Sequence, residues 1–279
     1  MLANNNEAII NKLAKNSVKT NKKQYAILFF TIILSAFMLF CVFTIGMTYL
    51  NSSRLQNTRL NGAEYDIVTM NGFTSEQLNT LQQNENIRSV GIESYAGFIQ
   101  STEYDKTVEI GLLWCDEVFW DNLMSPARTK LDGHYPQNKN ELMVTKDILK
   151  TCGNENLSVG DSLILTYENN TGVYTDEFVI SGIWDGYGDT SAGFVSKAFY
   201  DETGYDLKNN GILCIKLNCN YVFPTTIQSI EKSLDFSDRQ IFAPTGYIEN
   251  SFKLLLGICG LALVICLSAY LLIYNILYL

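Results

Sequence analysis

The sequence has 279 residues, of which 47% are hydrophobic and only 18% are charged, against roughly 25% charged residues in an average soluble domain. This composition excludes a disordered chain and favours contact with a membrane. The formal net charge is −9, from 20 basic and 29 acidic residues, which excludes a protein with the basic surface of a nucleic-acid binder.

The N-terminal segment, residues 1–24, is rich in lysine and is predicted to lie in the cytoplasm. Its apolar residues fall at helical spacing between the lysines, as Ile10, Leu13 and Ala14 show. Such a helix can lie on the inner leaflet with its lysines near anionic headgroups. A disordered lysine-rich tail is the alternative.

Residues 25–50 are predicted to form the first transmembrane helix, since these 26 residues (50 − 25 + 1) include no Asp, Glu, Lys or Arg. At ~1.5 Å per residue the helix exceeds the ~30 Å hydrocarbon layer. The run is too long for the apolar part of a signal peptide, and no Ala-x-Ala site follows it, so we expect a permanent span. A second uncharged run ends the chain, and residues 253–279 are predicted to be the second transmembrane helix.

The lysine distribution predicts the orientation of these spans. Five lysines precede the first run and two arginines follow it, so the positive-inside rule places the N-terminus in the cytoplasm and residues 51–252 outside the plasma membrane. The exterior part contains 28 of the 29 acidic residues, all except Glu7. This charge either attracts cationic substrates such as basic peptides or only keeps the surface soluble.

The exterior region opens with a strand–helix–strand pattern. Residues 63–70 are predicted to form a strand that Asn71-Gly72 closes. Thr74 and Gln77 then make a capping box at the start of a short helix. Residues 87–92 are predicted to be the second strand of this unit.

The same pattern recurs at the end of the exterior region, with a strand at 212–217, a helix at 224–234 that Pro224 opens, and a strand at 239–242. Because each unit is joined to one span, we expect the two units to share one sheet. Residues 95–200 between them are rich in β-formers and turns. The predicted fold class is an α+β exterior domain, with two βαβ-type units and a mainly β inserted subdomain, flanked by two transmembrane α-helices.

Four of the seven cysteines, Cys115, Cys152, Cys214 and Cys219, lie in the exterior region. An exterior location permits disulfides, yet four cysteines in 202 residues (252 − 51 + 1) are not a disulfide scaffold. We expect buried free thiols, and the sequence leaves their disulfide state open. The cysteines lack the spacing of a zinc site, so no metal ligands are predicted.

The sequence offers no set of catalytic residues, and we predict that the protein is not an enzyme. Its single histidine, His134, lies in a turn motif, and Cys115 would have to meet it by chance of folding. A Walker A loop needs a Gly-Lys pair, and the sequence has none. We therefore predict no catalytic, cofactor-binding or metal-binding residues and no cofactor, so that any ATP hydrolysis must come from a partner subunit.

Four motifs stand in order within the inserted region: Leu131–Pro136 (LDGHYP), Glu141–Val144 (ELMV), Leu157–Leu163 (LSVGDSL) and Phe178–Ile183 (FVISGI). In this order between two spans they resemble the extracytoplasmic core domain of MacB-like, FtsX-like ABC transporter permeases. That family pattern has a Gly-x-x-Pro turn, a Glu that opens a strand, a Val-Gly-Asp turn and an apolar strand with an internal glycine. The lysine-rich N-terminus, the exterior domain and the two spans resemble the N-terminal half of such a permease.

These motifs have a structural explanation. Gly160 is expected to adopt a positive φ in a turn where Asp161 bonds to its own backbone, and Gly133 and Pro136 bound another turn. Glu141 is expected to accept hydrogen bonds from backbone amides. We therefore assign the motifs to the scaffold.

The resemblance implies a permease subunit of a bacterial ABC transporter, in which a separate cytoplasmic ATPase drives movement of the extracytoplasmic domain. Its implied partners are that ATPase, a second permease copy or half, and the plasma membrane, with no nucleic acid. Export of antimicrobial peptides, or resistance to them, is one function of such proteins. Because these permeases have further spans, we expect either a fragment of a longer permease or a half-sized subunit. The alternative is a two-span cell-surface sensor or ligand-binding protein without transport activity.

Overall fold

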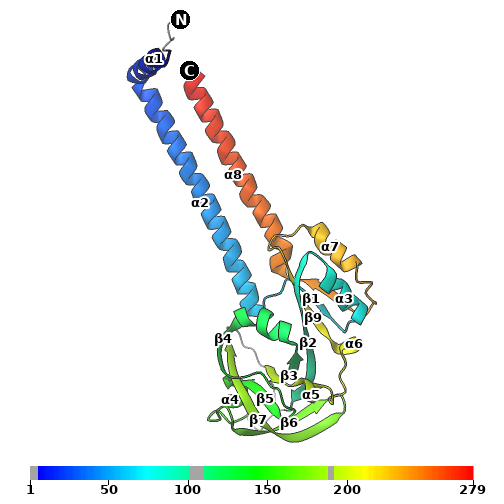
Figure 1. The fold of residues 1–279 in the computed structure, drawn as a ribbon. Helices are drawn as coiled ribbons and strands as arrows, with labels where there is room; N and C mark the ends of the chain where they lie inside the picture. Colours follow the sequence, from blue (N-terminus) through cyan, green and yellow to red (C-terminus); the bar gives the residue numbers. More distant parts are fainter. Residues whose placement is uncertain (1–5, 101–109, 188–191, 279) are drawn as a thin grey trace. The chain divides into compact units, whose positions relative to one another are not determined.

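The structure is a computed structural model, and it describes residues 6–100, 110–187 and 192–278 (Figure 1). The chain divides into two compact units. One, called here the sheet unit, is Ser52–Phe252. The other, called the helical unit, comprises Met1–Asn51 and Lys253–Leu279.

The helical unit contains α1 (Asn6–Thr20) and most of α2 (Lys22–Asn61) and α8 (Gly246–Tyr278). Within the described residues, α2 and α8 are the two helices long and apolar enough to cross a membrane. Large apolar side chains along them are exposed, as lipid-facing residues are in a bilayer. Both helices continue past the uncharged runs into the sheet unit. The predicted helices at the two ends of the sequence are therefore present.

The sheet unit begins and ends with two interleaved βαβ units. The first is β1 (Ile67–Met70), α3 (Ser75–Gln83) and β2 (Ile87–Ile99), and the second is β9 (Ile212–Leu217), α7 (Pro224–Lys232) and β10 (Ile241–Pro244). The strand order is β10-β1-β9-β2, and each neighbouring pair is antiparallel. Each unit thus encloses one strand of the other, as in ferredoxin-like folds. The prediction that the two units share one sheet is confirmed.

The two faces of this four-stranded part are covered by different elements. On one face, Leu81 of α3 and Ile230 of α7 pack in one core with Ile215 of β9. On the other face, Cys214 packs in a second core with Phe119 of the short helix η1 (Val118–Leu123). The alternation along β9 follows the period of two of a strand.

The inserted region forms a closed ring of strands together with β2, which explains its β-rich sequence. Its strands are β3 (Ile110–Cys115), β4 (Arg128–Gly133), β5 (Glu141–Thr145), β6 (Ser162–Asn169), β7 (Gly172–Gly186) and β8 (Ala192–Val195). The pairings run β2-β3-β8-β5-β7-β6 and return to β2, while β4 adds to β7 from outside. A third core fills the ring with side chains such as Leu112, Leu142 and Phe178. The short helices η2 (Ser125–Ala127), α4 (Lys146–Thr151), α5 (Lys197–Tyr200) and α6 (Leu207–Asn210) join these strands.

Some predicted boundaries differ from the structure. The strand predicted at 63–70 begins only at Ile67, and in the connection before it Glu64 N donates to Leu123 O, outside the neighbouring strands, at 2.6 Å. The strand predicted at 87–92 extends to Ile99, and the one at 239–242 lies at 241–244. The capping box of α3 is present as predicted.

Candidate functional site

The four sequence motifs meet along one strand, β7. Gly133 at the end of β4 pairs with Gly182. Glu141 at the start of β5 and Ser162 at the start of β6 both pair with Val179. The first three motifs therefore all contact the fourth, and the set forms one structural junction within the ring.

The turn at Gly160 has the conformation that the sequence predicts. Gly160 has a φ of +95°, its N–H donates to Ile180 O at 2.8 Å, and Ile180 N donates back to Asp161 O at 2.9 Å. The Asp161 carboxylate accepts from Ser158 N at 2.8 Å. Backbone hydrogen bonds thus hold the Val-Gly-Asp turn against β7, and the turn has a structural role.

Gly133 is required more strictly than Gly160. Its φ is +88°, and a Cβ atom there would lie 2.2 Å from Ser181 O, whereas a Cβ atom at Gly160 would meet nothing within 4 Å. The glycine allows β4 and β7 to approach, after which His134 N donates to Ser181 O at 2.9 Å.

Glu141 binds backbone amides, as predicted. Its carboxylate accepts from Gln137 N at 2.7 Å and from Asn138 N at 3.1 Å. Partial burial acts to raise the pKa of Glu141, but these hydrogen bonds outweigh it and hold the pKa below its ordinary value. The carboxylate therefore stays ionised and closes the turn before β5.

A group of charges in the sheet unit was missed by the sequence analysis. Lys216 of β9 has a side chain only 6% exposed, and its Nζ lies 3.1 Å from Glu64 Oε1 and 3.2 Å from Asp66 Oδ2. Lys216 Nζ donates a hydrogen bond to Asp66 Oδ1 at 3.3 Å, and Leu217 N donates one to Asp66 Oδ2 at 2.9 Å. Burial raises the pKa of Asp66, although Lys216 and the Leu217 amide act to lower it. The only hint in the sequence is a single lysine within an otherwise apolar strand.

Asp66 also joins the two connections that lead from the sheet to α2 and α8. Its backbone carbonyl accepts from Thr245 N at 2.8 Å, and Thr245 O in turn accepts from Glu249 N in α8 at 3.2 Å. Asp66 itself lies five residues after the end of α2. We call Glu64, Asp66, Lys216 and Thr245 the charged joint. Asp66 therefore bonds both to β9 and to the residue that precedes α8.

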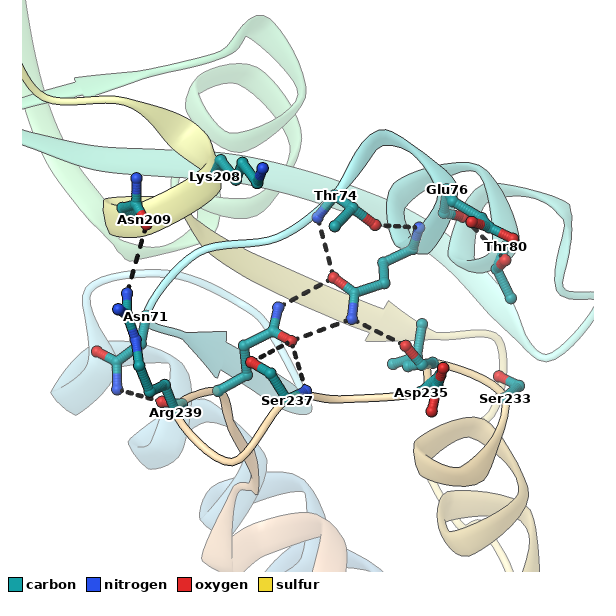
Figure 2. A pocket seen from close by; sticks show the side chains of 13 residues that line it. Asn71, Thr74, Glu76, Thr80, Lys208, Asn209, Ser233, Asp235, Ser237 and Arg239 are labelled. Atoms are coloured by element: carbon teal, nitrogen blue, oxygen red, sulfur yellow. Dashed lines mark hydrogen bonds between the residues drawn. The ribbon is translucent and has the colours of Figure 1, made fainter.

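A polar pocket of about 560 Å³ lies where the loops before α3 and after α7 meet (Figure 2). Within this pocket, Gln240 Nε2 donates to Gln77 Oε1 at 3.0 Å. Gln77 Nε2 donates to Leu234 O at 2.8 Å. None of the unpaired buried polar atoms of the described residues belongs to this pocket. The buried polar side-chain atoms of its lining are therefore paired, and the hydrogen bonds of Gln77 and Gln240 join the two loops.

Another cleft, of about 550 Å³, is lined in part by Cys115 and Tyr135. Burial raises the pKa of the Cys115 thiol well above its ordinary value, so the thiol remains protonated. His134 is exposed, and its Nδ1 lies 3.0 Å from Tyr135 O. The structure shows no hydrogen bond between His134 and Cys115 among the described residues, so it does not assemble the pair that a nucleophile would need.

All seven cysteines are free. Cys115 and Cys214 are buried, as expected for structural thiols, but Cys219 is exposed and Cys152 is half-buried, so the expectation of burial is wrong for these two. Cys219 lies two residues beyond the end of β9, in a surface loop. Within residues 6–100, 110–187 and 192–278, no group of three His, Cys, Asp or Glu residues is arranged to hold a metal ion.

The geometry is thus that of a domain carried between two helices of membrane-spanning length. No family model matches the sequence, and no curated protein matches it. Solved structures similar to the fold include the periplasmic region of MacB from Actinobacillus actinomycetemcomitans, with 12% identity, 70% of this chain and 95% of that chain covered, and a TM-score of 0.45.

Two further solved structures are similar. They are the extracellular domain of the noncanonic ABC-type transporter YknZ from Gram-positive bacteria (12% identity, 64% and 98% covered, TM-score 0.41) and a domain of a putative permease protein from Porphyromonas gingivalis (10% identity, 65% and 89% covered, TM-score 0.41). All three are domains of transporter or permease proteins, the class that the four motifs resemble. With TM-scores of 0.41 to 0.45, the likeness to these domains is distant.

Proposed function

We propose that this chain is a permease-type subunit of a bacterial ABC transporter, with the sheet unit outside the plasma membrane. The observation that carries the proposal is the set of four motifs, which occur in the family's order and meet on β7 as one folded module. A separate cytoplasmic ATPase supplies the energy, since the sequence has no Gly-Lys pair to bind phosphates.

The charged joint supports a role in transmitting movement. Both connections to membrane-length helices are bonded to Asp66, which is itself held by Lys216. Movement of the helices, driven by the ATPase, reaches the sheet unit through this joint. The acidic charge of the sheet unit suits a cationic cargo, and antimicrobial peptides are the class proposed.

The proposed orientation is tested with the native exposed thiol. A membrane-impermeant maleimide added to intact cells should label Cys219, and Cys219→Ser should remove most of the label. Asn11→Cys in the Cys219→Ser background should be labelled only after lysis, because α1 is proposed to be cytoplasmic. Labelling of Asn11→Cys but not of Cys219 in intact cells would reverse the orientation.

The proposed partner is tested by purifying the tagged full chain from its own host in mild detergent. Mass spectrometry should find an ABC ATPase in the complex, and ATP hydrolysis should depend on that subunit. A histidine kinase in its place would favour a two-span sensor. ATP hydrolysis by the chain alone would contradict the proposal.

A further inference from the structure

The loop between β9 and α7 carries an exposed aromatic ring. Phe223, the residue before α7, is 61% exposed, although its ring centroid lies 4.7 Å from that of Phe252. Phe252 belongs to α8 and is half-buried. The two rings form an aromatic pair with one open side on the sheet unit.

Phe252 lies beside the second proposed span in the sequence, and Phe223 is in ring contact with it. Phe252 precedes Leu254, the first residue of the uncharged run, by two residues, which is about 3 Å of helix rise. The headgroup layer on each side of a bilayer is roughly 5–8 Å thick. With 4.7 Å between the ring centroids, the Phe223 ring comes within reach of that layer.

The surroundings of Phe223 suit lipid better than a protein partner. The exposed side chains that follow it on α7 include Thr225 and Gln228, which are polar. A single exposed ring does not supply the ~800 Å² per partner of a standard protein interface. Aromatic rings at the level of the headgroups, in contrast, are a common anchor of membrane proteins.

We propose that Phe223 and Phe252 lie in the headgroup layer of the outer leaflet, so that the β9–α7 loop is a lipid contact of the sheet unit separate from the spans. This inference rests on the proposed membrane position of α8. The loop holds the start of α7 at the membrane surface, so tilting of the sheet unit would require Phe223 to leave the lipid.

The test uses the photoreactive residue p-benzoylphenylalanine in the full chain, reconstituted in phosphatidylcholine–phosphatidylglycerol nanodiscs. It replaces Phe223 in one variant. In two control variants it replaces exposed leucines, Leu263 within the second uncharged run and Leu131 on β4. After irradiation, mass spectrometry quantifies phospholipid adducts. We expect adducts at 223 and 263, with roughly tenfold less at 131.

The outcomes separate this inference from the proposed function. Adducts at 263 with only the Leu131 level at 223 would overturn the lipid contact and leave the span in place. An absence at both 223 and 263 would overturn the span and the inference together. Crosslinks from 223 to protein in place of lipid would assign the ring to a partner subunit and would also overturn the proposal.

Discussion

The charged joint permits a quantitative test by Lys216→Met. Methionine keeps most of the apolar stem of Lys216 but removes the cation that lies 3.2 Å from the buried Asp66 carboxylate. Breaking a buried pair in this way costs about 3–5 kcal/mol, because a buried charge is left uncompensated. The sheet unit has 201 residues (252 − 52 + 1), and a domain of this size loses roughly 2–4 °C in Tm per kcal/mol. The expected decrease in Tm is therefore roughly 6–20 °C.

The loss should depend on pH. Burial already raises the pKa of Asp66, and removal of Lys216 raises it further. Below that pKa Asp66 is neutral, and the penalty of an unpaired charge disappears. The Lys216→Met loss should therefore be larger at pH 8 than at pH 5, and Asp66→Asn in the same chain should recover part of it.

Tryptophan fluorescence of the full chain in detergent is a suitable assay, since the three tryptophans, Trp114, Trp120 and Trp184, are all buried in the sheet unit. Lys139→Met is the matched control, because the Lys139–Glu202 pair is exposed, at 57% and 62%, and such pairs contribute about 0–1 kcal/mol. A Lys216→Met loss no larger than that of Lys139→Met, or equal losses at pH 5 and pH 8, would refute the reasoning.

Three further predictions concern single residues of the sheet unit, each measured by the same thermal unfolding. Gly160→Ala should lower the free energy of unfolding by about 1–2 kcal/mol for its positive φ alone. Gly133→Ala should lower it more, because its Cβ also meets Ser181 O, and equal losses would contradict the close approach of β4 and β7. Burial raises the pKa of Glu93 from 4.5 to about 7, so the free energy of unfolding should fall by about 2–3 kcal/mol as the pH rises from 4.5 to 7. Glu93→Gln should remove this fall, and a Glu93→Gln variant with the same pH profile as the wild type would show that Glu93 is hydrated. His134→Ala should change stability by less than about 0.5 kcal/mol, because the ring is exposed, and a transport phenotype lost without a change in Tm would indicate chemistry at His134.

Local patterns in the sequence were sufficient for the parts of the fold that depend on neighbouring residues. The capping box of Thr74 and Gln77, the strand 212–217 and the positive φ of Gly160 each follow from residues within a few positions of one another. That the two βαβ-type units share one sheet followed less directly, from the position of each unit beside a span, whereas the order of the strands, β10-β1-β9-β2, was not predicted.

Features that depend on distant partners were not predictable from one sequence. Lys216 and Asp66 are 150 residues apart, and no spacing rule joins a lysine in one strand to a carboxylate before another. Among the described residues, the register that closes the ring between β2 and β6 pairs Phe98 with Glu168 and Ile99 with Tyr167. Such pairings are decided by the packing of the whole core.

The 13-residue strand β2 belongs to both parts of the sheet unit, since its first half pairs with β9 and its second half helps to close the ring. No flexible linker separates the two parts along this strand, which at ~3.3 Å per residue is about 40 Å long. If the helices move as proposed, a rotation of β9 would therefore reach the ring through β2 itself. The register irregularity between Tyr95 and Gly97 lies within this shared strand.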